Sequence, residues 1–212
     1  MNGILKHNDP DTLWKFSENL TSICILGALW FLCSLPVVTI GASTAAMHQV
    51  FLRNLMHGSK PLVRPFFTAF RENFKQSTIL WLIMLAAATL FALDAYYYFC
   101  HSQKNYFHFG MGIAMLCLLG IVVMVFGYVF PMTALYHNSV KKTLMKSAQY
   151  AFVSWPWTLL MFAIHIAVPI ILSKGLWFLA LISAGVVGFA DSRIMIRAFR
   201  RDIPAGRGVR KF

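Results

Sequence analysis

Long uncharged runs alternate with short basic segments along this chain. The uncharged runs cover residues 19–52, 76–93, 105–140, 147–173 and 175–190. Because roughly 20 apolar residues in a helix cross a bilayer, the pattern predicts about five transmembrane helices, at about 20–40, 78–99, 110–134, 157–173 and 175–192. The last two are joined tightly at residues 173–175, so one bent re-entrant pair is the alternative for them.

The segment 43–76 between the first two predicted spans has a different pattern. Apolar residues recur at helical spacing over 44–57, and after the GSKP sequence a phenylalanine stripe alternates with basic residues. Basic amphipathic helices of this kind lie in the membrane interface or dock on partners. We therefore expect this face to bind anionic lipid headgroups or a cytoplasmic protein. Its candidate residues are Arg53, Arg64, Phe67, Phe70, Arg71, Phe74 and Lys75, in a stripe that also includes Phe66.

Composition strengthens the membrane prediction. The 212 residues are 58% hydrophobic and 12% charged, with a mean hydropathy of +0.64, whereas a soluble domain carries about 25% charged residues. The sequence therefore predicts an all-α polytopic helical membrane protein, with cytoplasmic amphipathic interfacial helices, forming a single membrane domain over residues 1–212.

The net charge of +12 indicates orientation rather than nucleic-acid binding, since the basic residues alternate with the spans. Most of the 19 Lys and Arg residues fall in segments 53–75 and 141–146 and in the basic tail 193–212. Cytoplasmic loops retain Lys and Arg. We thus predict an N-terminus outside and a C-terminus in the cytoplasm.

The stretch CSLPVVTIGAST, residues 33–44, interrupts the first uncharged run. Pro36 removes a backbone donor and disfavours helix at the preceding residue. The stretch has two interpretations: a broken helix forming a transport site, or a turn at the inner membrane face, with Ser43 or Thr44 capping the next helix. The orientation favours the turn. The candidate residues of this motif are Ser34, Pro36, Thr39, Gly41, Ser43 and Thr44.

Three polar residues within the predicted spans are candidates for function or structure. Asp94 and His165 are intramembrane polar residues, which are expensive to bury; structural hydrogen bonding is the alternative to a transport or relay role. For Asp94, Lys104 and Lys174 are the candidate partners. We expect Asp191 to form a helix-end ion pair with the nearby arginines.

The blocks LWFLCSLPVVTIGASTAAMHQVFLRNL, FFTAFRENFKQSTILWLI and YVFPMTALYHNSVKKTLMKSA resemble the YesL-like family of bacterial multi-pass membrane proteins. The biochemical activity of that family is unassigned. The resemblance implies a bacterial plasma-membrane protein encoded beside carbohydrate ABC importers and glycan-degrading enzymes. It carries over no catalytic residues.

The sequence contains no GxxxxGK[ST], GxSxG or HExxH motif and no paired-carboxylate motif. We therefore expect no enzyme activity, no metal and no cofactor. The predicted function is that of a non-catalytic accessory or assembly partner of a carbohydrate ABC importer. The alternative is a small secondary transporter or channel for a sugar or other small solute. The expected partners are the lipid bilayer and importer subunits, with a homo-oligomer left open.

Overall fold

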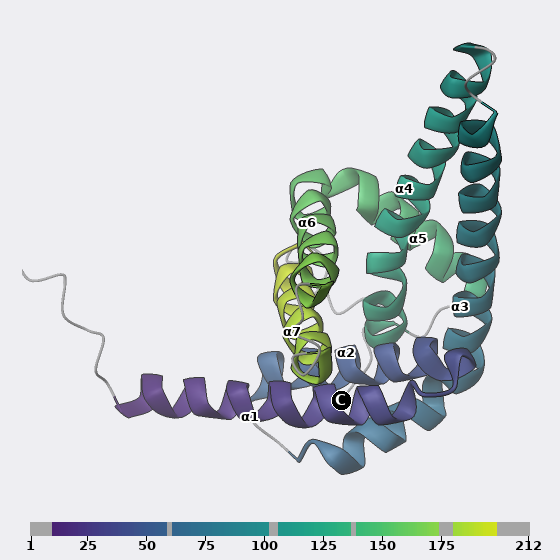
Figure 1. Cartoon of the computed structure of the whole chain (residues 1–212). Helices are drawn as coiled ribbons and strands as arrows, with labels where there is room; N and C mark the ends of the chain where they lie inside the picture. The colour runs from purple at the N-terminus through teal and green to yellow at the C-terminus, as the bar shows by residue number, and fades with distance from the viewer. Residues whose placement is uncertain (1–9, 59–60, 102–105, 137–138, 174–179, 199–212) are drawn as a thin grey trace, which may run out of the picture.

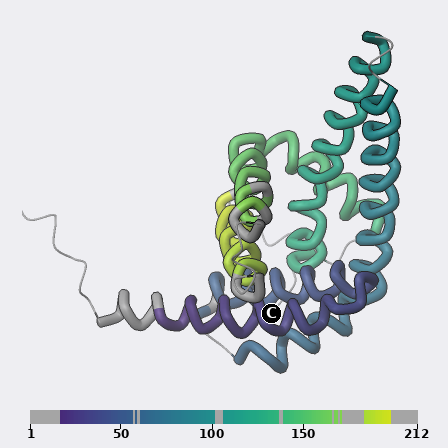
Figure 2. Tube along the Cα trace, in the orientation of Figure 1, coloured from purple at the N-terminus to yellow at the C-terminus, as the bar shows by residue number. Residues whose placement is uncertain are grey.

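A computed structural model describes residues 10–58, 61–101, 106–136, 139–173 and 180–198, and these parts are helical without a β-strand (Figures 1 and 2). The all-α prediction is therefore confirmed. The elements are α1 (Pro10–Cys33), the short 3-10 helix η1 (Val37–Thr39), α2 (Ile40–His57), α3 (Val63–Cys100), α4 (Tyr106–Leu135), α5 (Val140–Val153), α6 (Trp155–Ser173) and α7 (Ala180–Ala198).

The first helix ends in the predicted turn. Helix α1 stops at Cys33, and Pro36 precedes η1 in an extended conformation. The prediction that Ser43 or Thr44 caps the next helix is wrong, because α2 already begins at Ile40. Both hydroxyls instead donate to carbonyls four residues earlier, within the helix.

Helix α3 is longer than the sequence suggested. The amphipathic segment 43–76 and the span 78–99 were expected to be separate elements, but residues 63–100 form one helix. It starts below the other helices and turns upward (Figure 1). Hydrogen bonds fix its first part: Asn73 donates to Gln49 of α2, and Gln76 donates to Thr143 of α5.

Helix α7 packs on α1 and α2, and α6 packs on α7, α4 and α5 (Figure 1). Glycine makes these contacts close: a Cβ at Gly185 would collide with the Ile23 carbonyl of α1, and one at Gly188 with Met47 of α2. Small residues in α7 thus permit the close approach of three helices. We call this group of helices, together with α5, the first half of α3 and the second part of α4, the body.

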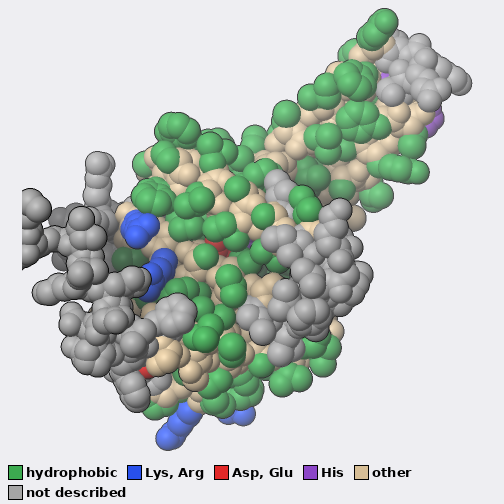
Figure 3. Space-filling model, turned by 60° about the vertical axis from the view of Figure 1, so that its left-hand side comes forward, with side chains coloured by type: hydrophobic (Ala, Val, Ile, Leu, Met, Phe, Trp, Pro, Cys, Tyr) green, Lys and Arg blue, Asp and Glu red, His purple; other side chains and the backbone are tan. Residues whose placement is uncertain are grey.

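The second half of α3 and the first part of α4 project from the body as an antiparallel hairpin (Figure 1). Apolar side chains cover this hairpin, as Figure 3 shows. Among the described residues, α3 and α4 are the two helices long and apolar enough to cross a membrane. The predicted count of five spans is not confirmed, and α1, the first predicted span, runs across the base of the hairpin rather than along it (Figure 1).

Candidate functional site

The residues of the CSLPVVTIGAST motif close the turn between α1 and α2. The Thr39 hydroxyl donates to the carbonyls of Cys33 and Pro36, at 2.6 and 2.7 Å. The Trp30 indole donates to Thr44 Oγ1 at 2.9 Å and ties the end of α1 to the start of α2. These bonds satisfy polar groups locally, which is what a structural turn requires.

Gly41 is the point of closest packing in the motif. A Cβ at this position would collide with the Ser77 carbonyl and with the Trp81 side chain of α3, and would press on Phe130 of α4. The absence of a side chain therefore lets α2 cross α3 backbone to backbone. Ser34 differs from its neighbours in the motif, because its hydroxyl is buried and forms no hydrogen bond within the described residues.

The first half of α3 presents the predicted basic aromatic face. The side chains of Phe67 and Phe74 are 45% and 40% exposed. Phe70, which lies between them in sequence, is half-buried, and the Phe70 ring lies 5.5 Å from the Phe74 ring. Basic side chains are exposed on the same stretch of helix. We define the basic aromatic face as Arg64, Phe67, Phe70, Arg71, Phe74 and Lys75.

Two residues expected with this face lie elsewhere. Phe66 is fully buried and packs in a core cluster with residues of α1 and α2, including Leu26 and Phe51. Arg53 donates to the Pro61 carbonyl at 2.7 Å, so its guanidinium holds the connection between α2 and α3. The predicted residues thus divide into two groups. Phe66 and Arg53 contact other parts of the body, and the remaining residues form the exposed basic aromatic face.

Asp94 lies half-buried in the projecting hairpin. Its expected partners, Lys104 and Lys174, fall outside the described residues. Within the described part of the chain, Asp94 forms no ion pair.

Polar side chains gather where α7 packs on α2 and on α6. We define this buried polar cluster as His48, Asp191 and Ser192, which are buried, together with His165, which is partly exposed. His48 Nδ1 lies 3.0 Å from Ser192 Oγ, and the Ser192 hydroxyl donates to the Gly188 carbonyl at 2.7 Å. Since that hydroxyl proton is already used, His48 Nδ1 is the donor to Ser192. Burial, followed by the charge of nearby His165, lowers the pKa of His48 to about 3, so its imidazole is neutral.

The second half of the cluster is a histidine–carboxyl pair. His165 Nε2 of α6 lies 3.4 Å from Asp191 Oδ2 of α7, and the Asp191 side chain is only 4% exposed. The expected pairing of Asp191 with arginines is therefore wrong. Arg193 instead lies over the Phe189 ring and Arg197 over the Trp157 ring.

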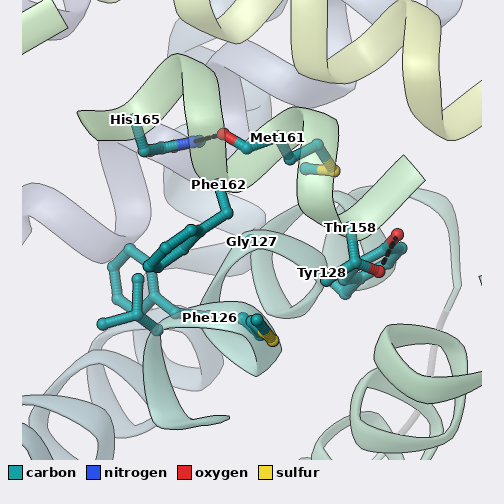
Figure 4. A pocket seen from close by; sticks show the side chains of 9 residues that line it. Phe126, Gly127, Tyr128, Thr158, Met161, Phe162 and His165 are labelled. Atoms are coloured by element: carbon teal, nitrogen blue, oxygen red, sulfur yellow. Dashed lines mark hydrogen bonds between the residues drawn. The ribbon is translucent and has the colours of Figure 1, made fainter. Parts of the chain in front are cut away.

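A small hollow of about 30 Å³ lies beside this pair, between α4 and α6, and His165 is one of its lining residues (Figure 4). About 10–15 Å³ suffices for one water molecule. The polar groups at its other end are Tyr128 and Thr158, whose hydroxyls lie 2.9 Å apart. Among the described residues, no three His, Cys, Asp or Glu side chains come together as a metal-binding group would.

The sequence identified His165 but not its partners in this cluster. His48 was not singled out within segment 44–57, and Asp191 was expected to be a charge at a helix end. The sequence did contain a signal. Polar residues at positions 191 and 192 follow the small residues of α7, and a polar residue stands at position 48 in an otherwise apolar stretch. Which helices meet there is long-range information that a single sequence does not provide.

Comparison with known proteins places part of the chain in context. Residues 23–95 match the model of a family described as a protein of unknown function, DUF624. The match covers α1 from Ile23, the turn, α2 and most of α3. No curated protein and no solved structure matches the chain. The similarity to a family of unknown function is thus supported, while the YesL-like resemblance and a bacterial origin are finer expectations that the match does not confirm.

Proposed function

We propose that this chain is a non-catalytic integral membrane protein that acts as an accessory or assembly partner of a carbohydrate ABC importer. The observation that carries the docking part of this proposal is the basic aromatic face of α3. The importer as partner is supported by the family resemblance seen in the sequence.

The basic aromatic face has the properties of a pre-formed docking surface. Its helix is fixed from the opposite side, because Asn73 is buried and bonded to Gln49 while Ser77 is packed inside. The exposed side combines aromatic rings with guanidinium groups, and both residue types are enriched at protein interfaces. A rigid surface loses little conformational entropy when a partner binds.

The proposed location is the bacterial plasma membrane, with the α3–α4 hairpin crossing the bilayer. The Lys and Arg distribution supports a cytoplasmic side for residues 63–76, for α5 and for the C-terminus. In the five-span arrangement the N-terminus lies outside, and this requires α1 to cross as well. The side of the N-terminus therefore distinguishes that arrangement from one in which α1 lies along the membrane surface.

The proposal is tested by purifying the full chain from its host in mild detergent and identifying co-purifying proteins by mass spectrometry. We expect importer permease or ATPase subunits with the wild-type chain. The double variant Arg71→Glu/Phe74→Ser should lose them, because it removes one cation and one exposed ring from the face. The matched control is Lys142→Glu, at an exposed cation of α5.

Recovery of the wild-type chain without importer subunits would refute the importer role. If importer subunits are recovered equally with the double variant, the docking surface lies elsewhere, and the basic aromatic face is left with the lipid-headgroup role.

A second candidate function is a small secondary transporter or channel for a sugar or other small solute. The buried polar cluster favours it, since such a function needs polar groups that converge inside the helical body. Of the residues expected from the sequence to serve transport, only His165 belongs to this cluster. Ser34, Thr39 and Asp94 do not contribute to it.

A further inference from the structure

The hydrogen bonds of His165 determine what its ring presents to Asp191. His165 Nδ1 lies 2.8 Å from the Met161 carbonyl (Figure 4). A carbonyl only accepts, so Nδ1 carries a hydrogen. In a neutral imidazole with a hydrogen on Nδ1, Nε2 carries a lone pair. That lone pair would then face Asp191 Oδ2 at 3.4 Å.

A bare carboxylate facing a lone pair would be unfavourable in this buried place. The remaining carboxylate oxygen, Oδ1, is buried and has no hydrogen-bond partner among the described residues. Charges in such surroundings are stable only when they are paired and hydrogen-bonded. One proton between Nε2 and Oδ2 removes the conflict, either as an imidazolium beside a carboxylate or as an imidazole beside a carboxylic acid.

Among the residues that the structure describes, no other charged group takes the place of this proton. Helix α2 contributes His48, which is neutral and donates to Ser192. Helix α4 contributes the Tyr128 hydroxyl, which is bonded to Thr158. Helix α1 packs on this part of α7 around Ile23, with Cys24 next to it as a titratable side chain, and the arginines of α7 lie over aromatic rings.

We propose that His165 and Asp191 form a proton-binding site, with His165 as the group that exchanges the proton with water. His165 is 37% exposed whereas Asp191 is 4% exposed, and His165 also lines the hollow between α4 and α6. A proton therefore reaches Asp191 through the imidazole. On release, the Nε2 proton passes to water and leaves a neutral imidazole and a buried carboxylate. This inference depends on neither proposed function.

Loss of the proton has a structural consequence. The pair joins α6 to α7, and the adjacent residue Ser192 joins α7 to α2. Deprotonation leaves an uncompensated charge at the meeting point of the three helices, which weakens their packing. The site therefore couples proton occupancy to the arrangement of the body.

The test uses the full-length chain purified in detergent. The proton is detected either as Nε2–H in histidine ¹⁵N spectra, with His165 assigned from His165→Asn, or as a protonated carboxyl in infrared spectra, assigned from Asp191→Asn. We expect one of these signals at neutral pH and its loss as the pH is raised further. In Asp191→Asn, His165 should keep its Nδ1 hydrogen and present a bare Nε2.

Thermal unfolding provides a second measurement that does not depend on assignments. The wild-type chain should unfold at a lower temperature as the proton is lost at alkaline pH, and Asp191→Asn should lose this dependence. Asp94→Asn, which removes a carboxyl of the hairpin, should retain it. The proposal is overturned if at neutral pH His165 has a bare Nε2 beside an ionised Asp191, or if Asp191→Asn keeps the alkaline loss of stability.

Discussion

The two halves of α3 share one continuous backbone but have different surroundings. In the first half, residues at helical spacing are buried against the body, including the polar residues Asn73 and Ser77. In the second half, beyond Met84, Ala95 is the one residue of the helix that is buried. Leucines and tyrosines are exposed there, among them Leu90 at 58% and Tyr96 at 71%.

This difference shows what apolar composition can and cannot indicate. An apolar helix that packs in a protein core has few exposed large side chains, whereas the hairpin exposes many of them, as the face drawn in Figure 3 shows. Such extensive exposed apolar surface is unusual for a water-soluble monomer. The arrangement of the body depends on specific contacts between side chains. The stability of the hairpin depends on the medium that surrounds it, which we take to be lipid.

The strongest test of this comparison is a charge placed in the hairpin. Leu90→Arg should reduce membrane integration by about 2.5–3.5 kcal/mol, the cost of an arginine near the centre of a spanning helix. The measurement is the inserted fraction in a membrane-insertion assay. The control is Met145→Arg on α5, because Met145 is as exposed, at 63%, but lies among lysines. Equal insertion of the two variants would contradict a lipid environment for the hairpin.

The next test contrasts two glycines. Gly41→Ala places a Cβ against the backbone of α3 and should lower the free energy of unfolding by about 1–3 kcal/mol through overpacking. Gly120→Ala in α4 meets no atom within 4 Å and should stabilise its helix by about 0.5–1 kcal/mol. Denaturation in detergent measures both. Effects of the same sign would show that close packing does not distinguish the body from the hairpin.

A smaller loss of stability, counted per pH unit, is expected at acidic pH. The pKa of His48 is about 3 in the folded chain and about 6.5 in an unfolded chain. The unfolded state therefore binds more protons between these values, and stability falls as the pH drops below about 6.5, by up to about 1.4 kcal/mol per pH unit.

His48→Asn keeps a donor for Ser192 without a titrating ring, so it should reduce this slope by one proton. Chemical denaturation at several acidic pH values gives the slope. His101→Asn, at the exposed end of α3, controls for the loss of an imidazole. An unchanged slope in His48→Asn would mean that His48 is not buried in its neutral form.

Several features could be predicted from the sequence because they depend on local pattern. The helical class follows from apolar spacing, and the turn after Cys33 follows from Pro36, since proline acts on its own backbone and on the residue before it. The exposed position of Phe67 and Phe74 follows from the amphipathic pattern. These signals need no knowledge of the tertiary contacts.

Other features could not be predicted because they depend on which helices meet. The continuity of α3 from residue 63 to residue 100 was not predicted, because it depends on how the first part of the helix packs against α2 and α5. Asp191 was paired with arginines that are close in sequence, whereas its partner His165 belongs to another helix. Similarly, the importance of Gly41 as a crossing point depends on Ser77, on a different helix of the fold.

The continuity of α3 has a mechanical consequence. A helix of 38 residues contains about 57 Å of hydrogen-bonded backbone at 1.5 Å per residue, nearly twice the roughly 30 Å thickness of the apolar part of a bilayer. The basic aromatic face is at one end of this curved helix and the exposed tyrosines are at the other. Because no loop separates the two ends, a partner that tilts or pulls the end with the basic aromatic face would transmit that movement along the helix to the end with the tyrosines.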